Sequence, residues 1–373
     1  MIKNKLIAGI IAIAAYSICT AQKLTFPPDG GNKKAMVSER IGITDVTIHY
    51  DRPAVKGREG KIWGDLVHTG YTDLGFGTSK AAPWRAGANE NTTFSFSTDV
   101  MIEGKPLAKG TYGFFIAMGA GNTDATLIFS NNSTSWGSFF YDQKEDALRV
   151  NVKTIPLNES TERLQYVFSD EKENSAVVSL VWEKLKIPFT VSVDYAKTQM
   201  ESLRRQLRND EGFDADAWVQ AVNFSLDHNG NLDEALQWSD YAINGVFVGQ
   251  KNFKTLSTKA NVLSKMNRMA EADSLMKQAM PLATMQELHA YGRQLLRQKK
   301  NAAALEAFKM NAQKNPNVFT TNAGLMRGYS ANGDYKNALK YAKAALAQAP
   351  DKANKDALEK YIPMLEKGQD INQ

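Results

Sequence analysis

Side chains suited to ligand binding gather in a short turn, just ahead of a run of alternating apolar residues. Trp84 offers a flat apolar surface for stacking. The polar side chains that follow it can direct hydrogen bonds to a ligand: Arg85, Asn89 and Glu90. Trp136, on a later turn, can supply a second stacking surface. Apolar walls with a few directed polar groups are the usual composition of a ligand pocket, so one hypothesis places a small-molecule or glycan site here.

The same turn has a structural interpretation. Trp84 can close the end of a β-sandwich while Arg85 and Glu90 form an ion pair. Gly87 and Asn89 can adopt the unusual backbone angles of a tight corner. The sequence leaves both interpretations open and favours the corner.

Catalysis would need a nucleophile, an acid–base pair or a metal. The residues that could supply it are His49, Asp51, His68 and Glu90. His49 falls in an alternating run and His68 begins a Gly-rich segment, and no metalloprotease, serine hydrolase or P-loop motif occurs. The sequence leaves open whether the chain is an enzyme and favours a non-catalytic protein. It assigns no catalytic residue, no metal ligand and no cofactor.

A second set of candidate binding residues lies in the carboxy-terminal half. Arg293 and Arg327 each follow by one residue the equivalent positions of neighbouring repeats, Gly292 and Met326. His289 lies four residues before Arg293 and therefore shares its helical face. Such a basic strip can hold a partner's carboxylate or acidic segment through charge-assisted hydrogen bonds. The alternative is that these are solvated surface charges paired with nearby acids.

Two different hydrophobic periods divide the chain. From about Met36 to Asp194, apolar residues recur at every second position, which predicts strands with one buried face. Turn-forming segments such as Gly119–Asp124 and Ser130–Gly137 separate these runs. Many short strands with frequent turns predict a mainly antiparallel β-sandwich.

After Asp194 the apolar spacing becomes helical and the chain begins to repeat. Four segments align on one alanine each, with separations of 37, 32 and 34 residues: Ala235, Ala272, Ala304 and Ala338. The spacing is close to the period of about 34 residues of tetratricopeptide repeats, and this half resembles such an array at its packing alanines. Residues 351–368 are predicted to form a polar-faced terminal cap. The fold predicted here is an all-α tetratricopeptide-like helical repeat domain.

The first residues have the layout of a secretory signal peptide. A basic start, MIKNK, is followed by the apolar run Leu6–Ala15 and by Ala21, which predicts cleavage before Gln22. Lipidation at Cys19 is the alternative. The predicted organisation is a signal peptide over 1–21, a β-sandwich over 22–194, a linker helix over 195–212, and helical repeats with a cap over 213–373. The predicted location is the periplasm or the extracellular space.

Composition narrows the function classes further. Cys19 is the only cysteine, so cleavage before Gln22 would leave a chain without disulfides or thiol chemistry. The formal net charge of +5 is too small to indicate a nucleic-acid-binding surface. The apolar run near the start is too short for a comfortable membrane span.

Five motifs of the first half, in order, resemble the bacterial family named domain of unknown function 2911 (DUF2911), over roughly Val37–Asp194. They are YDRPAVKGREGKIWGDLV (Tyr50–Val67), PWRAGANENTTFSFS (Pro83–Ser97), IEGKPLAKGTYGFFIAMG (Ile102–Gly119), TLIFSNNSTSWGSFFYD (Thr126–Asp142) and VWEKLKIPFTVSVD (Val181–Asp194). The resemblance implies an exported protein, typical of the Bacteroidetes, with no assigned activity and with helical repeats after the domain. The chain departs from the family at His68–Pro83, where its link is longer.

These features together favour an exported, non-catalytic interaction or envelope-assembly protein whose repeats bind a protein partner. The alternative is a small-molecule or glycan-binding protein, or a hydrolase, with its site on the sandwich.

Overall fold

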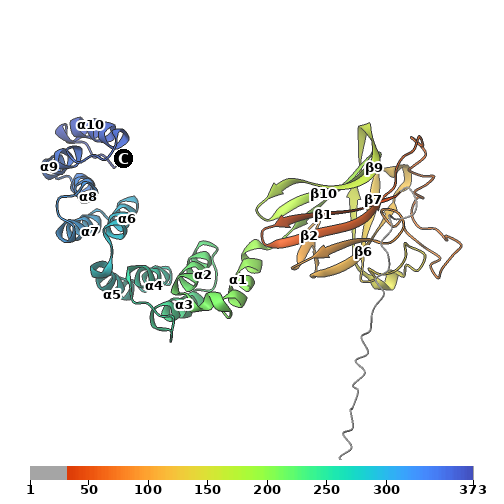
Figure 1. Ribbon diagram of the computed structural model, residues 1–373, viewed down its shortest axis with the longest axis horizontal. Coiled ribbons are helices and arrows are strands. Elements are labelled where there is room, and N and C mark those ends of the chain that lie inside the picture. The colour runs from red at the N-terminus through yellow and green to blue at the C-terminus, as the bar shows by residue number, and fades with distance from the viewer. Residues whose placement is uncertain (1–31, 373) are drawn as a thin grey trace, which may run out of the picture. The chain divides into compact units, whose positions relative to one another are not determined.

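The computed structural model describes residues 32–372, and the chain divides into two compact units between Ser192 and Val193. The first unit is built of strands and the second of helices (Figure 1). The expected signal peptide, with Cys19 and Ala21, lies outside the described residues.

Two antiparallel sheets make up the described part of the first unit. The larger has the strand order β1 (Lys33–Ile41), β2 (Thr44–Arg52), β3 (Thr92–Phe96), β6 (Gly110–Met118), β7 (Asp124–Ser130) and β8 (Asp146–Lys153). The smaller has the order β5 (Lys105–Leu107), β4 (Val100–Ile102), β10 (Ser175–Ser192) and β9 (Ile155–Lys172). Short 3-10 turns lie at η1 (Ala120–Asn122) and η2 (Gln143–Glu145).

The sheets pack face to face through aromatic side chains. Phe94 of β3 is fully buried, and its ring centroid lies 5.7 Å from that of Tyr166 and 5.8 Å from that of Phe189, both in the smaller sheet. Buried and partly exposed residues alternate along β3, because successive side chains of a strand point to opposite faces. The predicted β-sandwich is confirmed.

The second unit consists of helices joined by short turns. Its helices are α1 (Tyr195–Gln206), α2 (Ala215–Asp227), α3 (Leu232–Asn244), α4 (Phe253–Lys265), α5 (Met269–Ala279), α6 (Met285–Arg297), α7 (Asn301–Lys314), α8 (Phe319–Ala331), α9 (Tyr335–Leu346) and α10 (Lys352–Glu366). Single turns of 3-10 helix occur at η3 (Asp210–Phe213) and η4 (Met280–Leu282). Successive helices from α2 to α9 form antiparallel pairs (Figure 1).

The aligned alanines lie where the helices of each pair touch. All four are at most 3 % exposed and lie on the second helix of a pair: Ala235, Ala272, Ala304 and Ala338. Small side chains at these positions let the paired helices approach closely. The predicted tetratricopeptide-like repeat is confirmed.

The ends of the helical unit also contribute to its core. Met200 of α1 and Leu207 after it are buried against Val222 of α2. At the other end, Leu358 and Leu365 of α10 are buried in one cluster with residues of α8 and α9. Among residues 32–372, no helix is long and apolar enough to span a membrane.

Candidate functional sites

Trp84, the expected stacking residue of the first candidate site, is part of the sandwich interior. Its side chain is 8 % exposed. Its ring stacks on Trp182 at 6.1 Å between centroids and meets Trp63 edge-on at 5.6 Å. Its backbone exchanges hydrogen bonds with Ile116 of β6. These contacts are the ones that the corner interpretation requires.

Arg85 closes the turn, but not through the expected ion pair with Glu90. Its Nη1 donates a hydrogen bond of 2.7 Å to the backbone oxygen of Asn89, and its guanidinium lies 5.0 Å from the centroid of the Phe139 ring. Gly137 lies directly against the guanidinium, where a Cβ atom would clash. The expected pair is wrong because the guanidinium is already engaged by a carbonyl and an aromatic face.

The backbone angles of the turn also differ in part from the expectation. Asn89 has a positive φ of 54°, as anticipated, but the second residue of this kind is Ala86, with a φ of 50°. Gly87 is needed for a different reason: a Cβ there would lie 2.6 Å from the Thr92 hydroxyl.

Glu90 pairs with Lys34 of β1, at 2.8 Å between Oε2 and Nζ. Lys34 also lies 3.8 Å from a carboxylate oxygen of Asp51, a residue that is 4 % exposed. Burial raises the pKa of Asp51, whereas the hydrogen bond from Lys34 lowers the pKa of Glu90. Opposed shifts in neighbouring carboxyl groups occur both in acid–base sites and in structural ion-pair networks.

The other residues considered for ligand binding or catalysis are dispersed. Trp136 is 52 % exposed and makes no ring contact among the described residues. His49 is exposed on β2, whereas His68 is partly buried and its pKa is lowered by burial. Neither histidine contacts a carboxylate within residues 32–372. No group of three or more His, Cys, Asp or Glu residues suited to a metal ion occurs in the same range.

The second candidate site brings its three residues together. His289 and Arg293 of α6 and Arg327 of α8 line one cavity of about 220 Å³. Residues of α8 and α10 complete its wall: Phe319, Thr320, Ala323, Met326, Asn354, Ala357, Leu358 and Tyr361. None of these lining residues is an aspartate or a glutamate.

Electrostatics make this cavity positive. Arg293 and Arg327 form no ion pair with any carboxylate in the described part of the chain. Burial lowers the pKa of His289, and the charges of Arg293 and Arg327 lower it further. The Nδ1 atom of His289 is buried and has no hydrogen-bond partner within residues 32–372.

Tyr361 of α10 fixes one of the two arginines. The Arg327 guanidinium lies 5.4 Å from the centroid of the Tyr361 ring, a cation–π geometry. Tyr361 and Asn354 were not anticipated, because α10 was expected only to cap the array. Their signal is present in the sequence: Asn354, Leu358 and Tyr361 are spaced by four and three residues and therefore share one helical face.

A larger cavity of about 540 Å³ lies on the other side of α6. Several amide side chains line it, from three first helices: Asn223, Asn261, Gln294 and Gln298. α6 thus contributes Gln294 and Gln298 to this cavity, and His289 and Arg293 to the basic one.

Comparison with known proteins finds a family match within the first unit. Residues 32–191 match the DUF2911 family, described as a protein of unknown function. The resemblance drawn from the five motifs is confirmed for this part of the chain. No curated protein matches the chain.

Solved structures similar to the chain include two tetratricopeptide repeat proteins. One, from Parabacteroides merdae ATCC 43184, is 14 % identical with a TM-score of 0.31, and the match covers 47 % of this chain and 70 % of that protein. The other is YrrB, described as having an unusual peptide-binding site, which is 18 % identical with a TM-score of 0.28, over 45 % of this chain and 88 % of that protein.

Proposed function

We propose that the helical unit binds an acidic segment of a partner protein and that the chain acts as a non-catalytic interaction protein. One observation carries the proposal: His289, Arg293 and Arg327 line a single cavity that has no carboxylate in its wall.

The chemistry of the cavity suits a carboxylate. Arginine presents a planar fork of donors that matches a carboxylate with two parallel hydrogen bonds. Because Arg293 and Arg327 have no acidic partner in the described residues, a ligand carboxylate need not displace an existing ion pair. Arg327 is oriented by the face of Tyr361, so less side-chain freedom is lost when the ligand binds.

The wall of the cavity is also suited to a peptide. Phe319, Met326 and Leu358 provide an apolar surface for a side chain next to the acidic residue. The Nδ2 of Asn354 donates to Asp351 at 2.8 Å, which leaves its Oδ1 to accept a hydrogen bond from a peptide N–H.

The cellular role follows from the expected export. A protein with a cleaved signal peptide would meet its partner in the periplasm or outside the cell, which fits an envelope-assembly function. A protein pulldown from envelope extracts tests the proposal. The variant with Arg293→Glu and Arg327→Glu should lose a specific partner that the unchanged protein retains, at equal thermal stability.

A matched control separates site-specific loss from a general change in charge. Arg205 and Arg208 are exposed, lie outside both cavities and form no ion pair in the described chain. Reversing these two to glutamate changes the net charge equally and should leave the partner bound. An identical set of captured proteins for both double variants would overturn the proposal.

A further inference from the structure

A cavity of about 500 Å³ lies in the sandwich unit, away from the Trp84 turn that the sequence singles out. Two loops form its wall, Tyr71–Ala81 and Tyr141–Gln143. The first belongs to the Gly-rich link His68–Pro83. The volume is within the range of about 300–1,000 Å³ that is typical of small-molecule sites.

Direct contacts hold the two loops together. Ser79 donates a backbone hydrogen bond of 2.9 Å to the carbonyl of Phe139. Phe76 packs edge-on against Phe139 at 5.3 Å between centroids, and Gly77 lies so close to the Phe139 backbone that a Cβ would clash. The irregular wall is therefore built before any ligand arrives.

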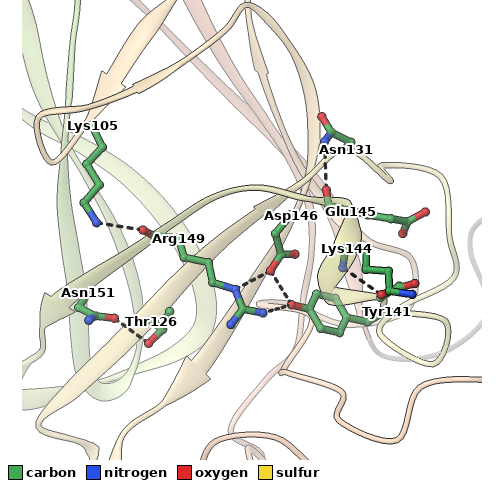
Figure 2. A network of polar contacts seen from close by, with 10 residues as sticks. Lys105, Thr126, Asn131, Tyr141, Lys144, Glu145, Asp146, Arg149 and Asn151 are labelled. Carbon is green, nitrogen blue, oxygen red and sulfur yellow. Dashed lines mark hydrogen bonds and ion pairs between the residues drawn. The ribbon is translucent and has the colours of Figure 1, made fainter.

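A buried polar network fixes Tyr141 in the wall of the cavity (Figure 2). The Tyr141 hydroxyl donates to Asp146 at 2.8 Å and accepts a hydrogen bond from Arg149, which also bonds Asp146. The guanidinium of Arg149 lies 5.6 Å from the centroid of the Tyr71 ring. Burial raises the pKa of Tyr141, so its hydroxyl stays protonated near neutral pH. The network therefore positions Tyr141 and Tyr71 and keeps the Tyr141 hydroxyl a hydrogen-bond donor.

The lining is polar and carries one side chain of each charge, Lys80 and Asp142. Lys80 forms an ion pair of 3.0 Å with Asp73, and Asp142 accepts a hydrogen bond from the backbone of Lys144. The remaining polar lining residues are neutral: Tyr71, Thr78, Ser79, Tyr141 and Gln143. Such a wall matches a ligand that is rich in hydroxyl groups and carries no net charge.

Exposed aromatic rings on the two loops add an apolar surface to this polar wall. Tyr71 is 41 % exposed, and Phe76 and Phe140, which touch each other at 6.1 Å between centroids, are 64 % and 42 % exposed. A sugar ring has hydroxyl groups at its edge and an apolar face of C–H groups. A sugar-binding site therefore needs both hydrogen-bonding groups and an aromatic surface.

We propose that this cavity is a binding site for a neutral oligosaccharide, with Tyr71 as the stacking surface and Thr78, Lys80 and Gln143 as hydrogen-bonding groups. The site is independent of the acidic-segment site in the helical unit.

Saturation-transfer NMR and fluorescence titration on the full chain test this assignment. The probes are maltohexaose, cellohexaose and mannohexaose, with glucose and a hexamer of galacturonic acid as contrasts. At least one neutral hexasaccharide should bind, more tightly than glucose and than the acidic hexamer. Tyr71→Ala should weaken that binding about tenfold, as expected for the loss of one aromatic contact.

Two further variants make the test specific. Gln143→Ala, on the other loop, should weaken binding in the same direction. Trp136→Ala removes an exposed aromatic ring that does not line the cavity and should leave binding unchanged. The assignment is overturned if no neutral hexasaccharide binds at millimolar concentration, if the acidic hexamer binds best, or if Trp136→Ala weakens binding as much as Tyr71→Ala does.

Discussion

We expect His289 to make ligand binding at the basic cavity depend on pH. Burial and the neighbouring arginines lower its pKa, so the imidazole is neutral near pH 7 when the cavity is empty. A bound carboxylate favours the charged form and raises this pKa. Binding therefore takes up a proton, and affinity for an acidic segment should increase as the pH falls from about 7.5 to about 5.5.

Calorimetric titration in buffers of different ionisation enthalpy measures this proton uptake. The His289→Gln variant keeps a hydrogen-bonding group but cannot be protonated, and its affinity should be nearly constant over the same range. An affinity of the unchanged protein that falls with decreasing pH would contradict the coupling.

Asp51 should affect stability with the sign of a buried acid. Because burial raises its pKa in the folded state, its contribution to stability is fully present below the unfolded-state pKa of about 3.9 and is lost as the pH rises through the folded-state pKa. Asp51→Asn mimics the protonated form. It should increase the free energy of unfolding at pH 7, with the difference vanishing below about pH 4.

Urea denaturation of both proteins at several pH values checks this expectation. The same comparison is made in a Lys34→Met background, which removes the cation beside Asp51. In that background Asp51→Asn should increase the free energy of unfolding at pH 7 by more than it does in the unchanged protein. A loss of stability in Asp51→Asn at pH 7 would instead show that Lys34 compensates fully for burial.

The position of a single residue was predictable from the sequence where a repeat, or one face of a helix or strand, determines it. Arg293 and Arg327 meet because equivalent positions of neighbouring repeats project the same way. The contacts of Arg85 were not predictable from the sequence. They depend on the conformation of the turn, which presents the Asn89 oxygen, and on a distant loop, which presents the Phe139 ring. Burial of Trp84 against Trp182 depends on which strands face each other, and strand spacing alone does not specify that.

At the scale of elements, the packing of α6, α7 and α8 depends on glycines of α6 and α8 that leave room for the large side chain of Phe308 in α7. Phe308 of α7 is fully buried, and a Cβ on Gly324 of α8 would lie 2.6 Å from its ring. Gly324→Ala should therefore destabilise the helical unit by about 1–3 kcal/mol, the usual cost of overpacking.

Thermal or urea denaturation of a double-mutant cycle measures this effect. Phe308→Leu creates space beside Gly324, so the double variant should lose less stability than the sum of the two single variants. Additive losses would mean that the two residues do not share this contact.

The element pattern was predicted best where one face is buried. Alternation identified β3 and the carboxy-terminal part of β10, and the aligned alanines identified the second helices. The first half of β9 was not predicted, since Ile155–Thr161 is largely exposed and carries no alternating apolar residues. The loop contacts around the 500 Å³ cavity were likewise not predicted from the sequence, because irregular segments have no hydrophobic periodicity.

At the scale of the whole molecule, the two units have separate cores. We expect a chain ending at about Asp194 to fold alone into a strand-rich domain with a cooperative thermal transition. Circular dichroism and calorimetry of that fragment give the answer. If the full chain folds but this fragment is insoluble, the helices are needed to complete the sandwich core.

The two proposed sites lie in different units, so each can be lost without the other. Arg293→Glu with Arg327→Glu should leave oligosaccharide binding intact, and Tyr71→Ala should leave capture of the protein partner intact. Parallel titration and pulldown of both variants measure this independence. Loss of both activities in either variant would contradict the assignment of separate sites.

Selection from a random peptide library on the full chain tests whether the basic cavity recognises acidic segments. The selected peptides should be enriched in aspartate and glutamate. The variant with Arg293→Glu and Arg327→Glu should bind them about a hundredfold more weakly, whereas the control with Arg205→Glu and Arg208→Glu should bind them as the unchanged protein does. Selected peptides without acidic enrichment, or equal binding to both double variants, would contradict the proposal.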